Sequence, residues 1–133
     1  MFRQAGVPLD IHQVFMNVDI TREGDMIDEI IEGLTIQASE TADNNFVQDI
    51  AEQLFDELNP NSKTGLDLVA LNIQRGRDHG LPGYTAYLER LGRRKPKSFD
   101  DLRSGIDDFS VKKLEKVYKQ VDDIDLFVGK FAK

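Results

Sequence analysis

The residues with the most chemical potential lie on one face of a predicted helix. Offsets of 0, 3, 4 and 7 bring four side chains into a row: Leu68, Leu71, Asn72 and Arg75. An amide and a guanidinium therefore continue a row of leucines, and burying either group is costly unless it is paired. The face is expected to meet a surface that is both apolar and anionic. The alternative is an internal polar network, in which Asn72 and Arg75 cap loops or pair with carboxylates.

Directly after this helix, Asp78 and His79 could in principle form an acid–base pair. Adjacent residues on an ordered turn seldom face each other, however. The surrounding segment 75–83 is dense in glycine, proline and alternating charges, which end helices and hydrogen-bond loop backbone. A structural role for both residues is therefore the favoured interpretation.

The elements that must position these residues are helical, and the sequence predicts an all-α fold. No sustained two-residue alternation and no Asn-Gly turn is present, so strands are not expected. Apolar residues with helical spacing, together with capping and stop signals, predict helices in these segments: 25–34, 45–58, 66–77, 84–91, one capped by Ser98 with Asp101, and a last clear one opened by Ser110.

Two of these helices carry detailed expectations. In the segment 45–58, Asn45 and Gln48 resemble a capping box, and Asn59-Pro60 predicts a stop before a flexible loop over 59–65. In the last helix the lysines should form a solvated face. Its inward residues are predicted to be Val111, Leu114, Val117 and Tyr118.

Composition excludes several classes of protein. The 133 residues include 24 acidic and 17 basic side chains, and the net charge of −7 argues against a nucleic-acid partner. With no cysteine, the chain forms no disulfide, thiolate zinc site or cysteine nucleophile. It shows no signal peptide and no apolar run long enough for a membrane span. The acidic tail residues Asp122, Asp123 and Asp125 lack the glycine and glutamate register of an EF-hand, so no metal site is expected.

The segment 66–92 resembles the signature of the animal haem peroxidases. It reads Leu-Asp-Leu-Val-Ala-Leu-Asn-Ile-Gln-Arg-Gly-Arg-Asp-His-Gly-Leu-Pro-Gly-Tyr through residue 84. Residues 8–34, 45–55 and 121–129 are also similar to that family. The resemblance implies that residues 1–133 form a partial, proximal-side portion of the family's mainly helical domain.

The resemblance also implies roles for the helical face. The residue at Asn72 would hydrogen-bond the axial histidine, and the one at Arg75 would pair with a haem propionate. Leu68, Leu71 and Phe55 match positions that pack near the proximal face, although a core role would explain them equally well. The implied cofactor is a b-type haem, with covalent attachment in the full protein left open.

The family's remaining machinery is expected upstream of Met1. This covers the axial and distal histidines, the distal arginine and the calcium loop, so calcium would belong to the full protein and not to this chain. Neither His12 nor His79 matches an iron ligand, and no catalytic or metal-binding residue is assigned. His12 is interpreted as a surface or core residue.

The expected function is that of a haem peroxidase fragment. The full protein would reduce hydrogen peroxide and oxidise a halide or small organic donor, outside the cell or in secretory vesicles. This chain is expected to be inactive alone. Two alternatives remain: a non-catalytic peroxidase-like module for interaction or adhesion, and an independent acidic helical binding domain.

Overall fold

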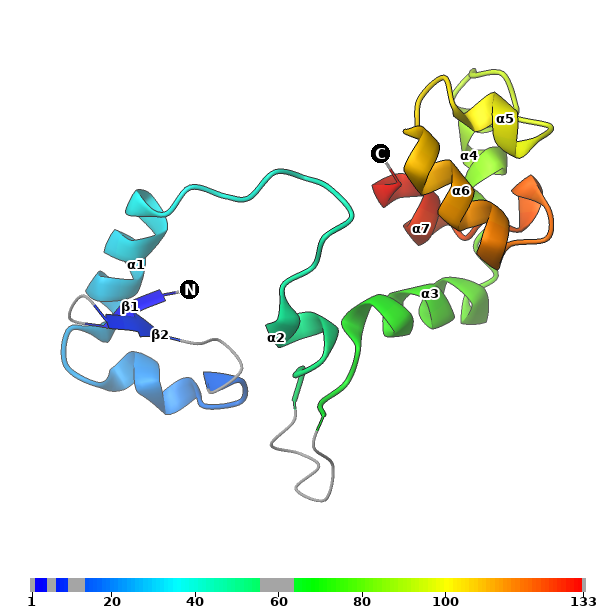
Figure 1. Ribbon diagram of the computed structural model, residues 1–133. Helices are drawn as coiled ribbons and strands as arrows, with labels where there is room; N and C mark the ends of the chain where they lie inside the picture. The colour runs from blue at the N-terminus through cyan, green and yellow to red at the C-terminus, as the bar shows by residue number, and fades with distance from the viewer. Residues whose placement is uncertain (1, 5–6, 10–13, 56–63, 133) are drawn as a thin grey trace. The chain divides into compact units, whose positions relative to one another are not determined.

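The structure, a computed structural model, describes residues 2–4, 7–9, 14–55 and 64–132, and for 2–4 and 7–9 it describes the backbone alone. Figure 1 shows the elements along the chain. The chain forms two compact units, Met1–Thr41 with Phe46–Val69, and Ala42–Asn45 with Ala70–Lys133. The predictions for His12, for most of the loop 59–65 and for the end of the 45–58 helix fall outside the described residues.

The first unit opens with a short hairpin that the sequence did not predict. Strands β1 (Phe2–Gln4) and β2 (Val7–Leu9) pair antiparallel, with Phe2 opposite Leu9. Three residues per strand are too few for a two-residue alternation to be recognised. Apart from this hairpin the described elements are helical, and the all-α prediction is confirmed.

A 3-10 helix, η2 (Val18–Arg22), leads to α1 (Met26–Ile36), which packs against β1. The helix predicted over 25–34 is confirmed. Met26 is buried, but most of the apolar face of α1 is not covered by other described residues. Four of its side chains are more than half exposed: Ile27, Ile31, Leu34 and Ile36.

The helix predicted over 45–58 is much shorter in the structure, since α2 spans Gln48–Ala51. The predicted capping box is wrong, because the Asn45 side chain donates to Asp43 and no side chain caps α2. The backbone then extends, and the Leu66 N–H donates to the Leu54 carbonyl at 2.7 Å. This pairing with a residue beyond the next loop ends the helical run, and local apolar spacing does not encode it.

The other helices lie further along the chain. They are α3 (Leu68–Asp78), α4 (Tyr84–Arg90), α5 (Phe99–Leu102), α6 (Asp108–Val117), the 3-10 helix η4 (Val121–Asp123) and α7 (Leu126–Phe131). The predictions over 66–77 and 84–91 are confirmed. Helix α7 was not predicted, because its segment has only six helical residues and a weak apolar period.

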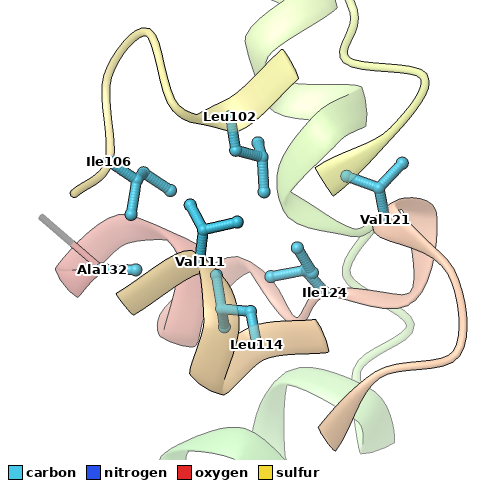
Figure 2. Packing of buried hydrophobic residues seen from close by; sticks show 7 residues of the cluster. All are labelled: Leu102, Ile106, Val111, Leu114, Val121, Ile124 and Ala132. Atoms are coloured by element: carbon cyan, nitrogen blue, oxygen red, sulfur yellow. The ribbon is translucent and has the colours of Figure 1, made fainter. Parts of the chain in front are cut away.

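One apolar core holds the second unit together (Figure 2). Its residues come from α5, α6 and η4 and from the segments that follow α5, η4 and α7: Leu102, Ile106, Val111, Leu114, Val121, Ile124 and Ala132. Val111 and Ile124 are fully buried. Val117, predicted to point inward, is 75% exposed. It is the last residue of α6, and within the described residues no further element covers it.

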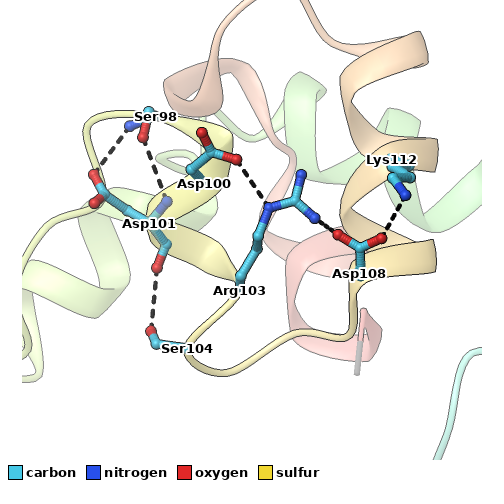
Figure 3. A network of polar contacts seen from close by, with 7 residues as sticks. All are labelled: Ser98, Asp100, Asp101, Arg103, Ser104, Asp108 and Lys112. Carbon is cyan, nitrogen blue, oxygen red and sulfur yellow. Dashed lines mark hydrogen bonds and ion pairs between the residues drawn. The ribbon is translucent and has the colours of Figure 1, made fainter.

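Local capping defines the starts of α5 and α6. Ser98 and Asp101 form the predicted capping box (Figure 3). Helix α6 begins two residues before the predicted Ser110, because Asp107 accepts a hydrogen bond from the Ser110 N–H at 3.0 Å. Arg103 links the two helices through ion pairs with Asp100 and Asp108. The predicted solvated face of α6 is confirmed, as its lysines are exposed.

Helices α4 and α7 approach each other closely at Gly129. This glycine is buried, and a Cβ placed on it would overlap the Tyr84 side chain. The Tyr84 N–H also donates to the Ile124 carbonyl at 2.8 Å. The residues before and within α7 are thereby fixed against the start of α4.

Candidate functional site: a cavity beside α3

A cavity of about 450 Å³ lies in the second unit, between α3 and the start of α7. From α3 it is lined by Asn72, Ile73, Arg75 and Gly76, so two of the side chains singled out in the sequence share one wall. Its volume is in the range typical of small-molecule and cofactor sites.

Asn72 and Arg75 have no side-chain partner within the described part of the chain. The Asn72 side chain is half-buried and the Arg75 side chain is exposed. At Arg75 only the backbone carbonyl is engaged, accepting from the His79 backbone N–H at 3.1 Å and from the His79 ring. Neither residue caps a loop or pairs with a carboxylate there, so the polar-network interpretation gains no support. An amide and a guanidinium remain available to a ligand.

The rest of the cavity is largely apolar. Leu81 follows α3, while Leu126 and Phe127 come from the first turn of α7. Together with Ile73 these side chains form hydrophobic walls around the two polar groups. The cavity therefore suits a ligand with a large apolar body and an anionic group.

The remaining candidate residues lie elsewhere. Leu68 is half-buried and Leu71 is 39% exposed, and neither lines the cavity. Phe55 belongs to the first unit, where its ring meets Phe15 edge to face with 5.5 Å between centroids. The roles of these three residues beside a cofactor stay predictions.

Four cavity residues of the C-terminal segment were not predicted as ligand-binding: Asp125, Leu126, Phe127 and Lys130. Asp125 and Lys130 are charged residues within a short apolar segment. Because the apolar period there is weak, the sequence does not show which of their side chains share a face with α3. Only the tertiary contact between this segment and α3 shows that these residues line the cavity.

Asp125 is bound on both oxygens. Arg77, at the end of α3, donates Nε–H and Nη2–H bonds of 2.9 and 2.7 Å, and the Tyr118 hydroxyl adds a bond of 2.8 Å. Hydrogen bonding by Arg77 lowers the pKa of Asp125 below its usual range. Burial, followed by the bond to Asp125, raises the pKa of Tyr118 to about 12. The carboxylate is therefore ionised and neutralised by its neighbours at physiological pH.

Asp78 and His79 do not pair with each other. Asp78 accepts a bond from the Gln74 side chain at 2.7 Å. The His79 Nδ1 lies 2.8 Å from the Arg75 carbonyl. A carbonyl only accepts, so Nδ1 carries the proton in this bond. Both side chains support the end of α3, as the structural interpretation predicted.

Two acidic residues of the tail, Asp122 and Asp125, make side-chain contacts within the protein. Asp122 accepts from the buried Thr85 hydroxyl at 2.5 Å and pairs with Lys95 at 3.0 Å. The Thr85 bond is the main cause of its lowered pKa. Within residues 14–55 and 64–132, no three acidic or histidine side chains gather as metal ligands would.

Comparison with known proteins identifies the family of this chain. The family described as "Animal haem peroxidase" matches residues 2–133. The chain belongs to the animal haem peroxidase family. It is 39% identical to chorion peroxidase of Drosophila melanogaster over 91% of its own length, 35% to peroxinectin A of Dictyostelium discoideum over 94%, and 36% to thyroid peroxidase of Homo sapiens over 92%.

The chain spans only 14%, 22% and 13% of those three relatives, respectively. It therefore corresponds to a small part of each of these three relatives. Among the helices that the structure describes, none combines the length and apolar character needed to cross a bilayer.

Proposed function

We propose that this chain supplies the proximal wall of the haem pocket of an animal-type peroxidase. The observation that carries the proposal is the position of the Asn72 and Arg75 side chains in one apolar cavity, where neither has a partner among the described residues. A porphyrin has a broad apolar face and two propionates, and this donor set fits it: hydrophobic walls for the ring and a guanidinium for a carboxylate.

The proposed roles follow from the side chains. Asn72 would accept the ring N–H of the axial histidine, which fixes the orientation of the imidazole and raises its basicity. Arg75 would pair with a propionate through its planar, permanently charged guanidinium. The haem iron, when bound, supplies the redox chemistry for reducing hydrogen peroxide while a halide or organic donor is oxidised.

Because the resemblance assigns the axial and distal histidines to other parts of the domain, residues 1–133 would be inactive alone. Purified chain with haemin should oxidise guaiacol no faster than free haemin. Turnover well above free haemin would contradict this part of the proposal.

The cavity assignment is tested by titrating the chain with haemin and following the Soret band. Arg75→Glu should weaken binding, because the variant places a carboxylate against the propionates. Arg90→Glu, at an exposed arginine in α4 outside the cavity, is the charge-matched control. Equal binding by Arg75→Glu and wild type would favour the alternative, a non-catalytic peroxidase-like interaction or adhesion module.

We also propose that the full protein acts outside the cell or in secretory vesicles. Calcium would bind to parts of the domain other than residues 1–133, which form one portion of a single larger domain.

A further inference from the structure

We propose that Lys130 is a second carboxylate-binding side chain of the cavity, acting together with Arg75 on a ligand that carries two carboxylates. This inference rests on the proposed function and assigns the partner of the second propionate within this chain. The supporting observations are which charged side chains line the cavity and which of them are paired with an opposite charge.

Lys130 lies in the last turn of α7 and lines the same cavity as Arg75. No carboxylate pairs with its ammonium among the described residues. Its ammonium lies beside the Phe131 ring, with 5.5 Å from Nζ to the ring centroid. That distance is close to the outer limit of a cation–π contact, so the ammonium is only weakly held.

The cavity has one lining carboxylate, Asp125, and it does not compete for Lys130. Its two oxygens are taken by the bidentate Arg77 and by the Tyr118 hydroxyl. The permanent charges left uncompensated around the cavity are therefore Arg75 and Lys130, both positive. Two cations without partners match a ligand with two carboxylates better than a ligand with one.

The position of Lys130 on α7 also suits an amphipathic ligand. Leu126 and Lys130 are four residues apart, so they lie on the same face of the helix, and both line the cavity. The aliphatic stem of a lysine packs along apolar surface while its ammonium stays near water. Lys130 can thus cover an apolar ring and meet a carboxylate at its edge.

The test uses metal-free protoporphyrin IX, so that no iron ligand is needed, and its dimethyl ester, which lacks the two negative charges. Binding to chain 1–133 is followed by porphyrin fluorescence. Lys130→Gln should weaken binding of the diacid about two- to fivefold, the range of a partly exposed ion pair, and leave the ester unchanged. Lys130→Arg should retain affinity. Lys116→Gln, on the exposed face of α6, is the matched control and should have no effect.

The outcomes separate the two proposals. If Arg75→Gln weakens diacid binding but Lys130→Gln does not, the role of Lys130 is overturned and the cavity assignment stands. If Lys130→Gln weakens diacid and ester equally, the effect comes from packing and the role is again overturned. If wild type binds no porphyrin, or Arg75→Gln has no effect, the cavity is not the porphyrin site and both proposals fail.

Discussion

Arg77 and Asp125 are joined by two hydrogen bonds, of 2.9 and 2.7 Å, although they stand 48 residues apart in the sequence. The first belongs to the end of α3 and the second directly precedes α7, so the pair ties together the two elements that enclose the cavity. It also neutralises the one carboxylate among the residues that line the cavity. Arg77 therefore has an electrostatic consequence for Arg75 and Lys130 without lining the cavity itself.

Removing Arg77 should expose that charge. Arg77→Gln leaves Asp125 with the Tyr118 hydroxyl as its remaining side-chain partner, so an anion faces the ligand's carboxylates and diacid protoporphyrin should bind more weakly. Adding Asp125→Asn removes the anion and should restore most of the affinity, which fluorescence titration measures. If the double variant binds as poorly as Arg77→Gln, the effect comes from lost structure instead.

Tyr118 should make stability depend on alkaline pH. Its folded pKa of about 12 lies above the ordinary value of 10.0, because burial disfavours the phenolate. The stability that Tyr118 contributes is therefore fully present below about pH 10, the pKa of Tyr in the unfolded chain. It is lost as the pH rises through about 12, the folded pKa. Urea unfolding at several pH values should show a smaller loss of stability between pH 10 and 12 for Tyr118→Phe than for wild type. Parallel curves would contradict the prediction.

Two valines on α6 provide a matched pair for the core. Val111 is fully buried and Val117 is 75% exposed. Val111→Ala removes the equivalent of two buried methylene groups. It should lower the free energy of unfolding by about 2 kcal/mol, a value that includes the cost of the cavity left behind. Val117→Ala should change it by less than about 0.5 kcal/mol. Urea denaturation followed by circular dichroism measures both, and similar losses would mean that the α6 register is wrong.

Gly129 should be intolerant of any side chain. Gly129→Ala places a methyl group against Tyr84, which should force α4 and α7 apart and cost about 1–3 kcal/mol. Gly105→Ala is the control, because a Cβ at Gly105 meets open space. Thermal unfolding compares the two variants, and an unchanged midpoint for Gly129→Ala would show that the helices do not pack this closely.

Local sequence patterns were enough to predict the helical class, the family and most of the helices. The capping box of Ser98 with Asp101 and the helix 66–77 depend on neighbouring residues alone, so spacing was enough to predict them. The same spacing put Asn72 and Arg75 on one face. Local periodicity failed at Leu54, where a long-range backbone pairing with Leu66 replaces the helix. The capping signal failed at Asn45, whose side chain bonds Asp43 instead.

The set of side chains that share the cavity depends on tertiary packing. Helical spacing placed Leu68 and Leu71 with Asn72, yet neither leucine lines it, because the cavity is bounded where α7 meets α3. Nothing in the order of residues shows that Lys130 lies beside Arg75 or that Arg77 neutralises Asp125. Those relationships depend on how elements far apart in the chain pack, which side-chain volumes and long-range hydrogen bonds determine jointly.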